Sequence, residues 1–193
     1  MKILIICGSP RKGNSEAICR KLHDILKKKG AKPELVLLRE KTIQMCGGCV
    51  AYCNHKLKCR IKDDMPGLLA KMLKADGYVF VCPNYFKMPP AIFKNFIDRC
   101  SIIYTRQCCT KKPDMSKKRA LVIAVGADEV KGINVCLMNV TDNFCKTIGI
   151  PVVAAKSFTS KSELNEPAMT SLRKITPSID KDLERMAEKL YKK

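Results

Sequence analysis

The sequence predicts an α/β fold in which a five-stranded parallel sheet is doubly wound, with helices on both faces. Short apolar runs alternate along the 193 residues with segments whose apolar side chains recur at helical spacing. The apolar runs are near-continuous, which is typical of parallel strands that are covered on both faces. A loop rich in glycine and serine joins the first run to the first helix, as in the first unit of a doubly wound sheet.

The first strand, helix and second strand occupy the N-terminal part of the chain. Residues 2–7 are an uninterrupted apolar run and form the predicted first strand. The helix after it ends in a run of lysines before Gly30, where cations complement the helix dipole and glycine terminates the helix. Residues 35–38 form the second strand. The apolar stripe of the helix comprises Ile18, Leu22, Ile25 and Leu26.

A long cysteine-rich loop, residues 44–64, separates the second strand from the next helix. This helix is expected at 65–74, and an apolar strand follows at 77–82. Prolines at 89 and 90 then open a helix at 91–99, because proline is tolerated in the first turn. The buried faces of the two helices carry Leu68, Leu69, Met72 and Leu73 in the first, and Ile92, Phe93, Phe96, Ile97 and Cys100 in the second.

The last part of the chain repeats the alternation. Residues 120–125 form the fourth strand, a helix covers 132–148, and residues 150–155 form the fifth strand. A polar stretch at 156–177 leads to a final helix with the apolar stripe Ile179, Leu183, Met186 and Leu190. We therefore expect one domain over residues 1–193, with the flavodoxin-like strand order 2-1-3-4-5 and the cysteine-rich loop inserted after the second strand.

Composition narrows the function classes. The formal net charge is +19, but the basic residues are spread along the chain without a nucleic-acid-binding motif, so we expect no specific nucleic-acid partner. No apolar run has the length of a membrane span, and the opening run is too short for a signal peptide. Twelve cysteines without a secretory signal favour the reducing cytoplasm, where clustered thiols more often serve metal or redox chemistry than disulfides.

The loop at residues 8–15 is the strongest motif. Free backbone N–H groups and the positive end of the helix dipole converge at such a strand–loop–helix connection. Ser9, Asn14 and Ser15 add side-chain donors, and Arg11 adds a positive charge. The loop matches neither the nucleoside-triphosphate pattern G-x-x-x-x-G-K-[ST] nor the dinucleotide pattern G-x-G-x-x-G. We predict a phosphate site of another kind, and the alternative is an ordinary polar turn.

This loop resembles the first loop of the flavodoxin-like NAD(P)H-dependent FMN reductases and quinone reductases, where it holds the FMN 5′-phosphate. The resemblance implies that role for Ser9, Arg11, Asn14 and Ser15. The loop at 83–88, with the helix after it, resembles the isoalloxazine loop of the same family. The topology brings both loops, and a third led by Gly126, to the carboxyl ends of the first, third and fourth strands, where such folds bind ligands.

The resemblance therefore implies flavin contacts in the second and third loops as well. The alternative for the two aromatic residues of the second loop is that they cap the core. The candidate residues are Pro83, Asn84, Tyr85, Phe86 and Gly126.

Four cysteines in the loop 44–64 form the second motif, with the spacing C-x2-C-x3-C-x5-C. Zinc and a four-iron cluster both take four cysteine thiolates. A compact single run suits an iron–sulfur cluster better than the two separated pairs that are common in structural zinc sites. Partly buried free thiols are the alternative. The candidate ligands are Cys46, Cys49, Cys53 and Cys59.

This loop and the Asp63-Asp64-Met65 start of the next helix resemble the iron–sulfur flavoproteins, a subgroup of the same family. The resemblance implies a [4Fe-4S] cluster near the flavin. The second gap of the cysteine run holds three residues here, Val50 to Tyr52, where the subgroup has two.

The function implied by the resemblance is that of a flavin-dependent oxidoreductase, which passes electrons between a [4Fe-4S] cluster, FMN and an external donor or acceptor. The flavin carries the chemistry, so no side chain is assigned as catalytic. The first alternative is a cluster-free NAD(P)H-dependent FMN or quinone reductase, and the second is a flavodoxin-like electron carrier without turnover.

The expected electron donor is NAD(P)H or an acidic ferredoxin-like protein, and the expected acceptor is a small molecule. Positive charge around the cysteine loop would attract an acidic protein and speed its encounter. We also expect a homodimer or homotetramer. The basic residues of the loop are Lys56, Lys58, Arg60 and Lys62.

Overall fold

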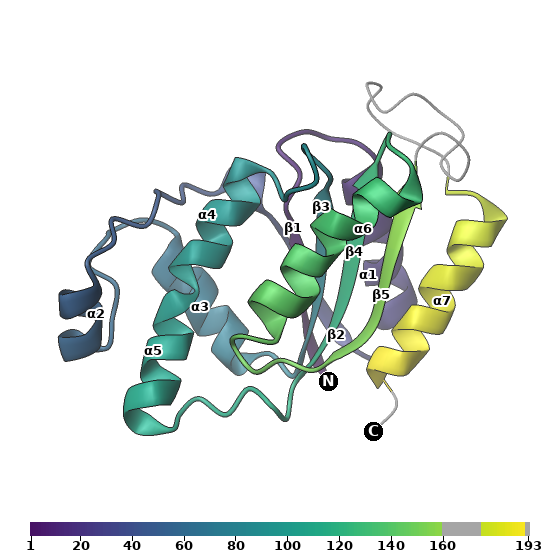
Figure 1. Cartoon of the computed structure of the whole chain (residues 1–193). Coiled ribbons are helices and arrows are strands. Elements are labelled where there is room, and N and C mark those ends of the chain that lie inside the picture. The colour runs from purple at the N-terminus through teal and green to yellow at the C-terminus, as the bar shows by residue number, and fades with distance from the viewer. Residues whose placement is uncertain (160–174, 192–193) are drawn as a thin grey trace.

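In the computed structural model, a five-stranded parallel sheet lies between two layers of helices (Figure 1). The structure describes residues 1–159 and 175–191. The strand order is β2-β1-β3-β4-β5, which confirms the predicted fold class. The strands are β1 (Lys2–Cys7), β2 (Lys32–Leu37), β3 (Gly77–Pro83), β4 (Arg119–Gly126) and β5 (Val152–Thr159), and all neighbouring pairs are parallel.

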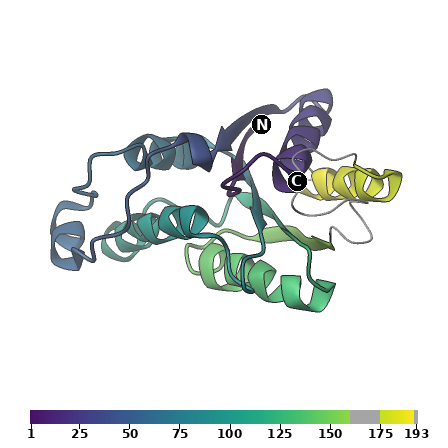
Figure 2. The same ribbon diagram turned by 90° about the horizontal axis from the view of Figure 1, so that it is seen from above.

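Two apolar cores form because successive side chains of a strand point to opposite faces of the sheet. In β1, Ile3, Ile5 and Cys7 face one core, whereas Leu4 and Ile6 face the other. Helices on both sides bury these faces (Figure 2). The first core is closed by α1 (Asn14–Lys28) and α7 (Pro177–Tyr191), and the second by α3 (Met65–Lys74), α4 (Ala91–Arg99), α5 (Ser101–Thr110) and α6 (Val130–Met138).

Aromatic packing fixes α4 behind the carboxyl edge of the sheet. Phe80 in β3 lies with its ring centroid 6.4 Å from that of Phe93 in the first turn of α4. The same ring is 5.5 Å from Phe144, so one side chain joins the central strand to helices on the second face. Because α4 follows residues 83–88 directly, this packing also limits where that loop can lie.

The structure adds two helices to those predicted. A short helix, α2 (Val50–Lys56), interrupts the cysteine-rich loop, and α5 follows α4 without a predicted counterpart. The α5 segment has almost no amphipathic pattern, and only Ile102 and Ile103 within it are buried. Packing against α2 and α4, and not an apolar stripe, therefore stabilises α5.

Element boundaries differ in three places. Strand β2 begins at Lys32 and is followed by a 3-10 turn, η1 (Leu38–Glu40). The helix predicted over 132–148 is α6 followed by a π-helical segment, η2 (Asn139–Cys145). Strand β5 continues to Thr159, four residues past its predicted end, because the polar side chains of Ser157 and Thr159 are buried.

Of the polar stretch expected at 156–177, residues 160–174 lie outside the described part of the chain. Among the residues that the structure describes, none of the helices combines the length and the apolar character needed to cross a membrane.

Candidate functional site

A small cleft of about 130 Å³ opens at the carboxyl edge of the sheet, where the loops after β1, β3 and β4 meet. It is the place at which ligands bind in doubly wound sheets. Every residue predicted from the sequence to contact a flavin lines this cleft except Phe86. The lining residues are Ser9, Arg11, Gly13, Asn14, Ser15, Pro83, Asn84, Tyr85, Val125, Gly126 and Ala127.

The loop after β1 turns sharply at its start. The N–H of Gly8 donates to the carbonyl of Val81 at 2.8 Å, which ties the loop to β3. A Cβ at Gly8 would lie 2.4 Å from Cδ2 of Phe93, so no other residue fits against α4 without displacing that ring. The Ser9 hydroxyl then donates to the carbonyl of Arg11 at 2.7 Å and stabilises the turn. Close packing against Phe93 therefore requires glycine at position 8.

The N-terminus of α1 supplies the donors that a phosphate needs. Among the described residues no side chain caps the helix, and the N–H groups of its first turn have no intrahelical acceptors. The amide oxygen of Asn14 is buried without a hydrogen-bond partner among the described residues. The first-turn N–H groups and the helix dipole fit a phosphate monoester, whereas the Asn14 oxygen is an acceptor and suits a hydroxyl or N–H donor.

The loop after β3 forms the opposite wall. The N–H of Asn84 donates to the carbonyl of Val125 at 2.7 Å, and its amide oxygen, like that of Asn14, has no partner among the described residues. Gly126 faces this wall closely, since a Cβ there would lie 3.1 Å from Cβ of Asn84. Two buried amide oxygens without a described partner, on Asn14 and Asn84, thus belong to opposite walls of one cleft.

Phe86 differs from the other predicted residues because the chain turns back at this point. Phe86 and Lys87 have positive φ angles of 51° and 64°, and Tyr85 pairs with Met88 across the turn. As a result, the Phe86 side chain is fully exposed and Tyr85 is 42 % exposed. The alternative that both aromatic residues cap the core is therefore wrong for Phe86.

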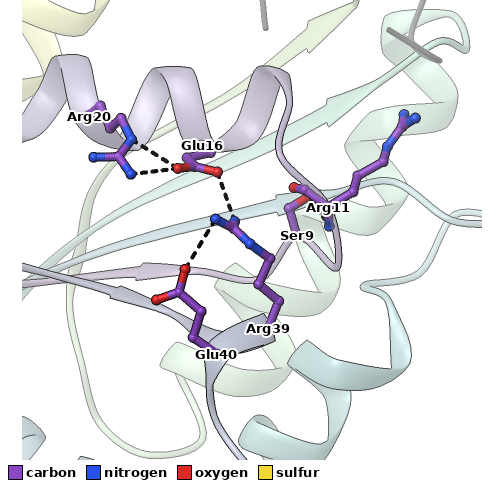
Figure 3. A network of polar contacts seen from close by, with 6 residues as sticks. All are labelled: Ser9, Arg11, Glu16, Arg20, Arg39 and Glu40. Carbon is purple, nitrogen blue, oxygen red and sulfur yellow. Dashed lines mark hydrogen bonds and ion pairs between the residues drawn. The ribbon is translucent and has the colours of Figure 1, made fainter. Parts of the chain in front are cut away.

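An ion-pair network centred on the buried carboxylate of Glu16 lies beside the loop at residues 8–15, and no sequence motif indicates it (Figure 3). Glu16, in the first turn of α1, receives Nε and Nη2 of Arg20 at 2.9 and 2.7 Å. Its other carboxylate oxygen lies 2.8 Å from Nη1 of Arg39, which comes from η1. That second contact is an ion pair without good hydrogen-bond alignment. Arg39 also contacts Glu40 at 3.3 Å.

The four predicted metal ligands are not gathered into a site. Cys46 is exposed, the other three are partly buried, and within the described residues no group of three or more histidine, cysteine or acidic side chains could hold a metal ion. Cys49 and Cys53 are the closest pair, with sulfur atoms 4.0 Å apart. Burial, together with the neighbouring Cys49, raises the pKa of Cys53 to about 11. The donor atoms suit a thiolate-bound centre, but this conformation of the loop does not.

The neck of the cysteine loop is held firmly. The Arg99 guanidinium forms two bonds to the Asp63 carboxylate, at 2.6 and 3.0 Å, and a third to the carbonyl of Gln44. Asp63 also accepts the N–H groups of Gln44 and Met65. Further along the loop, Arg106 in α5 donates to the carbonyl of Leu57 at 2.7 Å. The loop is therefore anchored at both ends to the helices that follow the second wall of the cleft.

A larger open groove, of about 550 Å³, lies between α1 and α7 and is lined mostly by lysine and acidic side chains. It lies away from the phosphate loop, toward the last turn of α1, and none of the three predicted loops reaches it. The smaller cleft, where the three loops meet, is therefore the candidate functional site.

Comparisons with known proteins identify the family and the fold of the chain. The sequence profile of the NADPH-dependent FMN reductase family matches residues 1–163. An iron-sulfur flavoprotein of Methanocaldococcus jannaschii is 31 % identical over 153 residues, 79 % of this chain and 75 % of that protein. One from Archaeoglobus fulgidus is 39 % identical over 99 residues, 51 % of this chain, and that match spans about half of the relative's length (48 %).

Solved structures show the same fold. An FMN-dependent NADH-azoreductase from Bacillus anthracis, solved in complex with FMN, superimposes with a TM-score of 0.66 at 16 % identity, over the whole of both chains.

Proposed function

This chain belongs to the NADPH-dependent FMN reductase family, and we propose that it is a flavin-dependent oxidoreductase that binds FMN in the cleft at the carboxyl edge of the sheet. The observation that carries the proposal is the convergence of three loops on one cleft, with the N-terminus of α1 on one wall and, on each side, a buried amide oxygen that has no partner among the described residues. An anion with a polar, planar extension matches this arrangement.

Each wall has a separate task in this proposal. The first-turn N–H groups of α1, Asn14 and Ser15 bind the 5′-phosphate, Ser9 keeps the turn in shape, and Arg11 adds charge at the mouth. Pro83, Asn84 and Tyr85 orient the isoalloxazine ring, and Gly126 leaves room beside them. Phe86 lies outside the cleft, beside Tyr85, and we assign it to cover the exposed side of the ring. Bound FMN would supply a hydride acceptor for reduced nicotinamide and a carrier of single electrons.

Loss of FMN from a loop variant tests this proposal. Purified protein is expected to bind FMN at micromolar concentration or tighter, measured by quenching of flavin fluorescence. The double variant S9A/N14A is expected to lose FMN while its circular dichroism spectrum stays that of the wild type. Wild-type protein that cannot be reconstituted with FMN contradicts the proposal.

We further propose that Cys46, Cys49, Cys53 and Cys59 bind a [4Fe-4S] cluster. The support is the donor set of four thiols on one anchored loop, and the relatives' description as iron-sulfur flavoproteins. Because the thiols are apart in the described conformation, the loop has to close around the metal, and the proposal is limited to binding. Iron and acid-labile sulfide assays after anaerobic purification test it.

A cluster-free NAD(P)H-dependent FMN or quinone reductase is the second candidate, and the dispersed thiols favour it. Oxidation of NAD(P)H with a quinone, in protein that contains FMN but no iron, is the result that supports it. Protein that binds FMN but oxidises no NAD(P)H supports a carrier role instead. The subunit arrangement, a homodimer or homotetramer, is a proposal that sedimentation analysis tests.

The proposed donor for a cluster-containing protein is an acidic ferredoxin-like partner, because the cysteine loop presents four exposed basic side chains. These are Lys56, Lys58, Arg60 and Lys62.

A further inference from the structure

The buried carboxylate of Glu16 lies at an unfavourable place for a protein that binds phosphate. It follows Ser15, which lines the cleft, and belongs to the first turn of the helix whose N-terminus faces the proposed phosphate. Only 3 % of its side chain is exposed. Burial would raise the pKa of Glu16, but Arg20 and Arg39 outweigh burial and lower that pKa, so the carboxylate is charged at neutral pH. A second negative charge is thus fixed close to an anion site.

The two arginines that neutralise Glu16 differ in their surroundings. The Arg20 side chain is 58 % exposed, and solvent screens much of its charge. The Arg39 side chain is 14 % exposed, so its field acts through protein. Figure 3 shows that Arg39 approaches Glu16 from the side opposite Arg20, and that Arg11 extends away from this network.

Arg39 also lies close to the root of the phosphate loop. Hydrogen bonding from Cys19 is the main reason that the pKa of Cys7 is lowered, and the N–H of Ser9 and the charge of Arg39 lower it further, whereas Glu16 acts in the opposite direction. Cys7 ends β1 and directly precedes Gly8 and Ser9. Arg39 and Glu16 therefore both exert their fields at the point where the loop begins.

We propose that Arg39 is a positioning and specificity residue for the flavin phosphate: held by Glu16 beneath the loop, it offsets that carboxylate and makes the cleft select FMN over riboflavin. This inference rests on the proposed FMN site and deepens it. Arg20, Arg39, Glu16 and Glu40 together carry no net charge, counted from the ionised side chains. Without Arg39 that sum is −1, and the phosphate site loses positive potential.

A structural role for Arg39 has to be separated from this charge effect. Arg39 joins the end of β2 to α1, so its loss will also lower the stability of the fold. Stability affects FMN and riboflavin alike, because the two ligands share the ring system and differ only in the phosphate. The ratio of their affinities therefore cancels the effect of overall stability, and the double variant below separates charge from local structure.

The test measures dissociation constants for FMN and for riboflavin by flavin fluorescence, at low and at high salt. In R39Q the preference for FMN, defined as the dissociation constant for riboflavin divided by that for FMN, is expected to fall about tenfold. This is the order expected for one unit charge acting within about 10 Å through a partly buried path. High salt should reduce the difference. In R39K the charge remains and so does most of the preference for FMN.

The double variant E16Q/R39Q gives the sharpest comparison. It leaves Arg20 and Glu40 and restores the wild-type net charge of zero, so its preference for FMN is expected to return toward the wild-type value although the contacts of Glu16 and Arg39 are lost. The matched control is K41Q, which removes an exposed positive charge two residues further along the same segment and should leave the ratio unchanged.

The outcomes separate the two proposals. If wild-type protein binds neither flavin, the proposed function fails and this inference fails with it. If wild-type protein binds FMN and R39Q keeps the wild-type ratio, or the double variant is worse than R39Q, only the charge role of Arg39 is overturned.

Discussion

Replacing Asp63 by alanine will remove the buried ion pair that closes the neck of the cysteine loop. The side chains of Asp63 and Arg99 are 0 % and 1 % exposed, so water cannot take the place of the lost partner. The variant leaves the Arg99 guanidinium charged and buried. It also removes the acceptor of the backbone N–H groups of Gln44 and Met65.

The expected loss is large compared with the stability of a domain. Removing one partner of a buried ion pair typically costs about 3–5 kcal/mol of unfolding free energy. Whole domains are stable by about 5–15 kcal/mol. In a chain of this size, about 4 kcal/mol corresponds to a fall in Tm of about 8–16 °C.

Urea unfolding followed by circular dichroism at neutral pH measures this loss. The matched control is D98A. Asp98 is the residue before Arg99 and forms an ion pair with Lys94, in which the Asp98 and Lys94 side chains are 40 % and 48 % exposed. Exposed pairs of this kind contribute about 0.5 kcal/mol or less. If D63A proves as stable as D98A, the reasoning about the buried neck is wrong.

The same pair predicts a pH dependence. Burial would raise the pKa of Asp63, but Arg99 and two backbone N–H groups outweigh burial and hold that pKa below its usual value. Because the pKa is lower in the folded state, the stabilisation is fully present above the unfolded value of about 3.9 and is lost as the pH falls through the folded pKa. The difference in stability between wild type and D63A should therefore narrow below about pH 4.

Three further predictions concern the proposed site. In G8A, the added Cβ meets Phe93 and should cost about 1–3 kcal/mol of stability as well as FMN affinity, whereas G47A, with open space around its Cβ, should cost far less; thermal melts and FMN titrations compare the two. In C59A, anaerobically purified protein should lose the broad iron–sulfur absorbance that the wild type is expected to show, and an unchanged spectrum would contradict the assignment of that ligand. Electron transfer from an acidic ferredoxin should slow as salt rises, and reversing the four basic charges of the cysteine loop should flatten that dependence in stopped-flow measurements, while the rate with NAD(P)H should not respond to the reversals.

The strands and the strand–loop–helix turn at residues 8–15 could be predicted from sequence because their signals are local. A strand buried on both faces is an apolar run, as in β1 and β3, and the strand–loop–helix motif at residues 8–15 needs only its neighbours to form. The parallel order of the sheet followed from alternation with helices. Pattern alone failed for α5 and for the end of β5, where burial comes from packing against other elements and not from an apolar stripe.

Only the tertiary structure determines which charged side chains near the site are buried and which partners they meet. Glu16 and Arg39, like Asp63 and Arg99, look like ordinary solvent-exposed residues in the sequence, because nothing local shows that they are buried or which partner each one meets. Their pairing depends on how β2 returns beside α1, and on how α4 packs beside the cysteine loop. A charge can be buried only where its counter-charge arrives by such long-range packing, so the tertiary structure alone determines which charges are buried together beneath the cleft and at the neck of the loop.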